Sequence, residues 1–112
     1  MRWLRTHLTT DEHDNADMTL DLLVDDGDIV VDRVPFCGWW GRLNSTELLP
    51  IVVRPDGRVD FGSDDETDQG ERYGFMRLRG RRLQVGEPFS LEWEDEYLLL
   101  VKSCRDLTEG LI

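Results

Sequence analysis

Five side chains near the N-terminus are of the types that bind divalent metal ions: His7, Glu12, His13, Asp14 and Asp17. Imidazole nitrogens and carboxylate oxygens are the usual protein ligands of zinc and related ions. The spacing of the five follows no known metal-binding signature, and the stretch lacks the pattern of a regular element. We therefore expect solvated loop residues here and no metal site.

A second carboxylate cluster lies in residues 62–71, a segment without apolar side chains. It consists of Asp64, Asp65, Glu66, Asp68 and Glu71. Calcium is the ion that such a loop could bind, but Gln69 stands where the sharp turn of a calcium loop needs glycine, and Phe75 stands where a bidentate glutamate should close the site. We expect an acidic surface loop, well suited to meeting a basic protein surface.

Basic side chains concentrate between residues 72 and 82. In a strand, Arg77 and Arg79 share one face, and the next alternating strand offers Glu92 and Glu94 with the opposite charge, so cross-strand ion pairs are the favoured interpretation. The alternative is a bidentate site for a phosphate or a carboxylate, formed by Arg77, Arg79, Arg81 and Arg82. No glycine-rich phosphate cradle stands beside these arginines.

Trp39 and Trp40 are adjacent between two glycines. Successive residues of an extended segment face opposite sides, so only one of the two indoles can lie in the core. The other lies against a neighbouring loop or, exposed beside Phe36, forms an aromatic anchor for a partner.

Nucleophilic catalysis finds no support in the sequence. None of the four serines lies in a Gly-x-Ser-x-Gly context, and the two histidines lie in the irregular N-terminal stretch. We expect no enzymatic activity and no cofactor. Cys37 and Cys104 are too few for a disulfide framework and match no zinc spacing, so two reduced thiols are expected.

The elements that position these residues read as strands. Met18, Leu20, Leu22 and Val24 alternate with more polar residues, which predicts a strand with one core face. The Asp-Gly pair after it predicts an antiparallel return over residues 29–34, and Pro55-Asp56-Gly57 predicts a second hairpin. Further strands are expected over residues 73–79, 83–85, 89–93 and 97–104, and a single helical turn over residues 44–47.

The fold class predicted from these elements is mainly β. We expect a small antiparallel barrel or sandwich of about six to seven strands, with at most one or two short helical turns. Residues 1–112 suit a single domain, in which residues 1–16 form an edge strand plus a loop. The pattern does not decide between barrel and sandwich, and it says nothing of the oligomeric state.

The net charge of −11 comes from 24 acidic and 13 basic residues, of which twelve are arginine. Such a surface disfavours direct binding to nucleic acid, because phosphate contacts need clustered positive charge. It attracts a basic partner, although self-repulsion for solubility, a GC-rich genome or a high-salt habitat would produce the same bias. No apolar run has the length of a membrane span or of a secretory signal, so we expect a cytoplasmic protein.

The function favoured by these features is a small acidic interaction module that binds, and in an inhibitory role neutralises, a basic protein. The expected partner-binding residues are Asp25, Asp26, Asp28, Trp39, Trp40, Asp64, Asp65, Glu66 and Asp68. The general profile is similar to that of small bacterial proteins that neutralise a partner, including immunity proteins.

Two alternative functions stay open. One is a small-molecule-binding barrel with a pocket of Trp39, Trp40, Trp93 and Tyr97, gated by arginines. The other is an accessory structural subunit.

Overall fold

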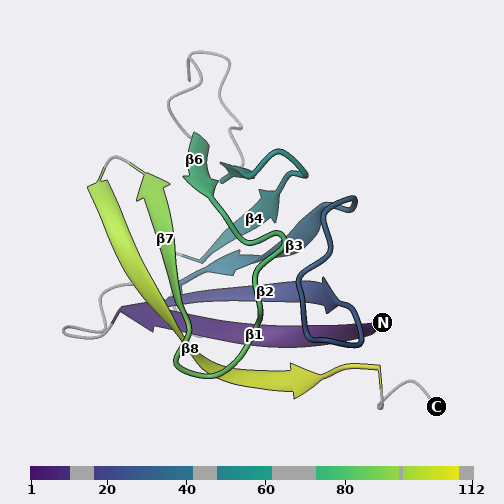
Figure 1. Cartoon of the computed structure of the whole chain (residues 1–112). Coiled ribbons are helices and arrows are strands. Elements are labelled where there is room, and N and C mark those ends of the chain that lie inside the picture. Colours follow the sequence, from purple (N-terminus) through teal and green to yellow (C-terminus); the bar gives the residue numbers. More distant parts are fainter. Residues whose placement is uncertain (11–16, 42–47, 62–72, 94, 109–112) are drawn as a thin grey trace.

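The structure is a computed structural model that describes residues 1–10, 17–41, 48–61, 73–93 and 95–108 (Figure 1). Over these residues it contains eight strands and no helix. The strands are β1 (Arg2–Thr10), β2 (Asp17–Val24), β3 (Phe36–Trp40), β4 (Leu49–Val53), β5 (Arg58–Asp60), β6 (Tyr73–Met76), β7 (Pro88–Trp93) and β8 (Asp95–Asp106). The predicted acidic loop and the predicted helical turn at 44–47 lie outside the described residues. The described residues therefore include no helix that is long and apolar enough to cross a membrane.

The strands form a closed barrel in which each strand pairs antiparallel with the next one in sequence. β8 then returns to pair with β1, from Leu4 opposite Asp106 to Thr10 opposite Leu99. The predicted mainly β, antiparallel fold is confirmed, and of the two architectures left open, barrel and sandwich, the structure has the barrel, with eight strands over the described residues in place of six to seven. The predicted edge strand at the N-terminus is wrong, because β1 is paired on both sides and the closed barrel leaves it no free edge.

The core follows from the alternation of side chains along the strands. On β2, Met18, Leu20, Leu22 and Val24 are fully buried and the residues between them are partly exposed, as predicted for a strand with one core face. The inward residues of the other strands join them in one apolar cluster, which includes Leu8, Phe36, Ile51, Val59, Phe61, Met76, Phe89, Leu91, Leu99 and Val101. Thr6 is the one buried polar residue among the described residues.

The hairpin predicted at Pro55-Asp56-Gly57 joins β4 to β5. Gly57 has φ +94°, a value that L-residues rarely adopt, and its N–H donates to the Arg54 carbonyl at 2.9 Å. The Asp56 carboxylate accepts from the Arg58 N–H at 2.9 Å. The turn residues therefore fix the reversal by their own hydrogen bonds.

The antiparallel return predicted over residues 29–34 is correct as far as Val31, and residues 32–34 form no strand. Around the Val24 to Val30 bridge, the Asp25 N–H donates to the Ile29 carbonyl at 2.9 Å and the Val31 N–H donates to the Leu23 carbonyl at 3.0 Å. The named strand that pairs along β2 is β3. On the side away from β2, Val30 exchanges hydrogen bonds with the segment before β7, donating to the Arg81 carbonyl at 3.0 Å and accepting from the Gly80 N–H at 2.9 Å. The strand predicted over residues 83–85 is absent, with only an Ile29 to Arg82 bridge nearby.

Candidate functional site

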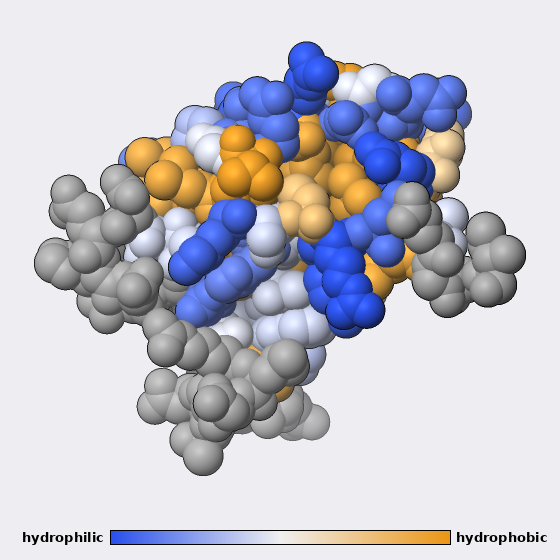
Figure 2. Space-filling view, turned by 90° about the horizontal axis from the view of Figure 1, so that it is seen from below, coloured by the Kyte–Doolittle hydropathy of each residue, from blue (hydrophilic) through white to orange (hydrophobic). Residues whose placement is uncertain are grey.

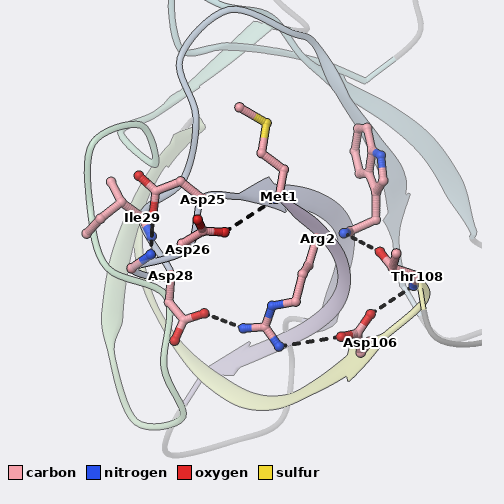
Figure 3. A network of polar contacts seen from close by, with 10 residues as sticks. Met1, Arg2, Asp25, Asp26, Asp28, Ile29, Asp106 and Thr108 are labelled. Carbon is pink, nitrogen blue, oxygen red and sulfur yellow. Dashed lines mark hydrogen bonds and ion pairs between the residues drawn. The ribbon is translucent and has the colours of Figure 1, made fainter.

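One end of the barrel gathers the β2–β3 connection, the start of β1 and the end of β8 (Figure 3). The Arg2 guanidinium lies between two carboxylates, donating to Asp28 from one nitrogen and to Asp106 from the other at 3.4 Å. The Trp3 N–H donates to the Thr108 hydroxyl at 2.9 Å. The hydrogen bonds with Asp28 and Asp106 also raise the pKa of Arg2 above its ordinary value, with Asp28 the larger cause.

The three aspartates predicted to bind a partner on this connection differ in what they do. One Asp25 carboxylate oxygen accepts from the Gly27 N–H at 2.8 Å and from the Ile29 N–H at 3.0 Å, which shapes the turn. Asp28 is held by Arg2. Asp26 is fully exposed, and its nearest charge is the N-terminal amino group at 3.6 Å. Asp26 is therefore the member of the three with a carboxylate free to meet a partner.

The segment between β6 and β7 forms the other wall of this end. The Leu83 N–H donates to the Asp28 carbonyl at 2.8 Å, in addition to the exchange at Val30 described above. The Arg79 guanidinium donates to the Val34 carbonyl at 2.6 Å. The two connections are thus held together by hydrogen bonds along residues 28–34.

Along the β2–β3 connection, with Gly80 as the one lining residue from the segment between β6 and β7, lies an apolar groove of about 560 Å³. Its lining residues are Met1, Leu23, Asp25, Ile29, Val30, Val31, Asp32, Arg33, Val34 and Gly80. The Met1 side chain is 73% exposed, which is the highest value among the large described hydrophobics. Asp32 and Arg33 stand on the rim at 3.9 Å from each other, both largely exposed, so their ion pair is weak. We name these ten residues the end groove.

The cross-strand ion pair predicted for Arg79 is wrong, because β6 ends at Met76 and the partly buried Arg79 side chain beyond it donates to a main-chain carbonyl. The Arg79 guanidinium lies over the buried Phe36 ring at 4.6 Å, and its Nε and Nη1 are buried without a hydrogen-bond partner among the described residues. Desolvation by burial lowers the pKa of Arg79. Arg77 is exposed, with its guanidinium 5.8 Å from the Phe75 ring.

The other two arginines also point elsewhere. The Arg81 guanidinium donates to Glu87 and to the Pro88 carbonyl, each at 2.8 Å, and covers the Phe89 ring at 4.3 Å. Arg82 is exposed. Arg77 and Arg81 share a small hollow of about 140 Å³ with Glu92. The negative charge of the Glu92 carboxylate would repel an anionic ligand there. The structure does not bring the four arginines together in one place.

Trp39 and Trp40 face opposite sides of the barrel wall, as predicted. Trp39 lies on the outside, half-buried, with the Arg5 guanidinium 5.3 Å from its ring, and Arg5 in turn is fixed by two hydrogen bonds to Asp21 at 2.8 and 2.9 Å. The aromatic residue that contacts Phe36 from a partly exposed position is Trp3, with ring centroids 6.2 Å apart. Sequence reasoning missed Trp3, because nothing in the pattern of β1 shows that its start meets the start of β3, a strand with which it does not pair.

Trp40 points inward and joins an aromatic cluster with Phe61, Trp93 and Tyr97. Phe61 and Trp93 stack at 3.9 Å, and the Trp40 ring lies 5.6 to 6.2 Å from the other three. The Trp93 Nε1 is buried and has no acceptor among the described residues. Three of the four residues predicted to line a ligand pocket thus come together, while Trp39 does not. The Arg81 guanidinium lies at the opposite end of β7 from Trp93.

Of the N-terminal cluster of possible metal ligands, His7 and Asp17 are described, and they form a pair on the outside of β1 and β2. Among the described residues, no group of three or more His, Cys, Asp and Glu side chains could hold a metal ion. Cys37 is a free, exposed thiol on β3, and Cys104 is a free, half-buried thiol on β8. Burial raises the pKa of Cys104.

Hydrophobic side chains also reach the outer surface. Figure 2 shows them gathered between hydrophilic ones on the face of the barrel seen from below in Figure 1. Among the described residues, Val85 is 66% exposed and Leu98 is 57% exposed.

The fold and the groove define a class, a closed up-and-down barrel of eight strands over the described residues, with an apolar groove beside one end. Comparison with protein-family models, with curated proteins and with solved structures found no match to this chain.

Proposed function

We propose that this protein is an acidic interaction module that binds a basic protein partner at the end of the barrel that carries the end groove. The observation that carries the proposal is the combination of an apolar groove with exposed carboxylates beside it, in a chain with a net charge of −11. Interfaces with a buried apolar centre and a charged rim are the usual design for such binding.

The charge supports the proposal through association rate. The summed field of a strongly acidic protein draws a basic partner toward it and raises the on-rate, an effect that salt screens. Asp32 adds an exposed carboxylate in the groove lining, and Asp26, next to the lining residue Asp25, adds another beside it, with side chains 75% and 103% exposed. Binding of this kind is how inhibitor and immunity proteins neutralise a target, and we extend the proposal to such a role in the cytoplasm of a bacterium.

A basic peptide tests the proposal before the partner is known. An arginine-rich peptide should bind at low salt, and its on-rate should fall steeply as the Debye length drops below about 10 Å. Reversal of the charges at Asp64, Asp65, Glu66 and Asp68 should slow association and leave the melting temperature unchanged. If a peptide of equal length with acidic side chains binds as well, the acidity serves solubility and the proposal fails.

A second candidate function rests on the buried Trp93 Nε1, a hydrogen-bond donor without an acceptor among the described residues. A small molecule with an acceptor atom would satisfy it inside the aromatic cluster, as in ligand-binding barrels. The close contacts among the rings count against this function, because a ligand would have to separate Phe61 from Trp93. Saturable quenching of tryptophan fluorescence by a small molecule, lost in Trp93→Phe, would favour it.

A further inference from the structure

We infer that the end groove takes an apolar side chain of the partner, carried on a basic segment whose Arg or Lys residue meets Asp26 or Asp32. The inference rests on the proposed function and names the chemistry of the segment that it would bind: an aliphatic residue such as leucine with a cationic neighbour.

The apolar part follows from the lining. Leu23, Ile29, Val31 and Val34 are partly exposed, so their side chains give the groove an apolar surface that water now covers. The volume of about 560 Å³ lies within the range of sites that enclose small ligands, so an aliphatic side chain fits inside. Met1 stands at the edge with an exposed, unbranched side chain, which can adapt to the shape of what enters.

The basic part follows from the rim. The lining holds two carboxylates, Asp25 and Asp32, against the single guanidinium of Arg33. The ion pair of Asp32 with Arg33 joins side chains that are 75% and 94% exposed, and Asp26 meets only the N-terminal amino group, itself exposed. Exposed ion pairs of this kind contribute little to stability. A cation of the partner can therefore replace Arg33 beside Asp32, or the amino group beside Asp26, at a small cost in free energy. An acidic partner would be repelled by the net negative charge of the chain.

The groove also exists before binding. Its walls are joined by the hydrogen bonds of Val30 with the segment before β7, and the Val34 carbonyl is held by Arg79. Arg2 also holds the turn at Asp28 by a side-chain hydrogen bond (Figure 3). A site whose walls are already ordered loses less conformational entropy when a partner binds.

Two peptides of equal charge test the inference. Acetyl-Gly-Arg-Leu-Arg-Gly-amide and the same peptide with glycine in place of leucine are titrated into the full chain at low salt, with binding followed by amide NMR shifts. The leucine peptide should bind ~10-fold or more tightly, since burying a leucine side chain contributes about 1.5 kcal/mol or more. The shifts should concentrate at Leu23, Val31 and Gly80, and leave Val52 on β4 unmoved.

Matched variants locate the effect. Val31→Thr with Val34→Thr keeps side-chain volume and makes the groove polar, so the preference for leucine should fall severalfold. Val52→Thr is the control, because Val52 is exposed on the outside of the wall and does not line the groove. If the double variant unfolds, the amide NMR shifts of the wild-type chain still show whether the leucine peptide binds at the groove.

Equal affinity of the two peptides, or shifts spread away from the groove, would overturn the inference. The proposed function would survive that result, provided that both peptides bind with the expected salt dependence. If neither peptide binds at low salt, both proposals fail.

Discussion

Gly38 lies against the main chain of β2 so closely that a Cβ atom on it would stand 1.8 Å from the Thr19 carbonyl oxygen. No side chain fits there unless β2 and β3 move apart, because the contact is with backbone and not with the end of a flexible side chain. We therefore expect Gly38→Ala to lower the free energy of unfolding by about 3 kcal/mol, at the upper end of overpacking effects. Urea denaturation measures it. Gly27→Ala is the control, since a Cβ there meets only ordinary contacts of 3.4 Å and more. A loss at Gly38 no larger than at Gly27 would contradict the prediction.

Asp25 and Asp26 are neighbours with different roles, and their substitutions should separate. Asp25→Ala removes the acceptor of two main-chain N–H groups and should lower the free energy of unfolding by ~1–2 kcal/mol. Asp26→Ala removes an exposed side chain and should change it by less than ~0.5 kcal/mol. Thermal and urea melts of the two variants check the order. Equal losses would mean that the Asp25 hydrogen bonds do not stabilise the turn.

Arg79 carries a positive charge into the barrel wall without a carboxylate hydrogen-bonded to it among the described residues. Arg79→Met keeps the aliphatic contact with Phe36 and removes the buried charge, whereas Arg79→Lys keeps a charge that is more strongly hydrated and loses the planar fork. We expect the methionine variant to be the more stable of the two, measured by the urea midpoint. The reverse order would show that the charge itself stabilises the fold.

The two thiols should react at different rates. Cys37 is exposed, while Cys104 is half-buried and its pKa is raised, so alkylation at neutral pH should label Cys37 first, as read by mass spectrometry. The raised pKa also gives a pH dependence. The folded chain holds the Cys104 proton more tightly than the unfolded chain, so its contribution to stability is complete below the ordinary thiol pKa of 9.0 and is lost as the pH rises through the folded value. Cys104→Ala should therefore lose less stability than the wild type on going to alkaline pH.

The parts of the fold that sequence predicts are those decided within a few residues. The alternation from Met18 to Val24 and the turn at Gly57 need no distant information, and both match the structure. The return beside β2 was predicted as far as Val31, but the hydrogen bonds of Val30 with Gly80 and Arg81 were not, because those partners lie about fifty residues further along the chain. A local apolar pattern does not show which distant segment will form main-chain hydrogen bonds with Val30.

The site was predictable in composition and not in arrangement. Asp25, Asp26 and Asp28 were expected at one surface, and the structure gives each a separate role. The groove itself was missed, because Met1, Leu23 and Val34 are separated in sequence and line one groove only in the folded barrel. Arg79 was expected to form a cross-strand ion pair, and no pattern of alternating charges reveals that its guanidinium lies over Phe36 instead.

The pairing of β1 with β8 gives the strands a ring-like order in which the first and the last are neighbours. Arg2 and Asp106 are in contact although 104 positions separate them, and Trp3 is hydrogen-bonded to Thr108. During synthesis, β1 has no partner on that side until nearly the whole chain exists, so closure is a late, non-local step that slows folding. The same adjacency means that a short linker between the ends, with new termini opened at the Pro55-Asp56-Gly57 turn, would keep every strand pair of the barrel intact.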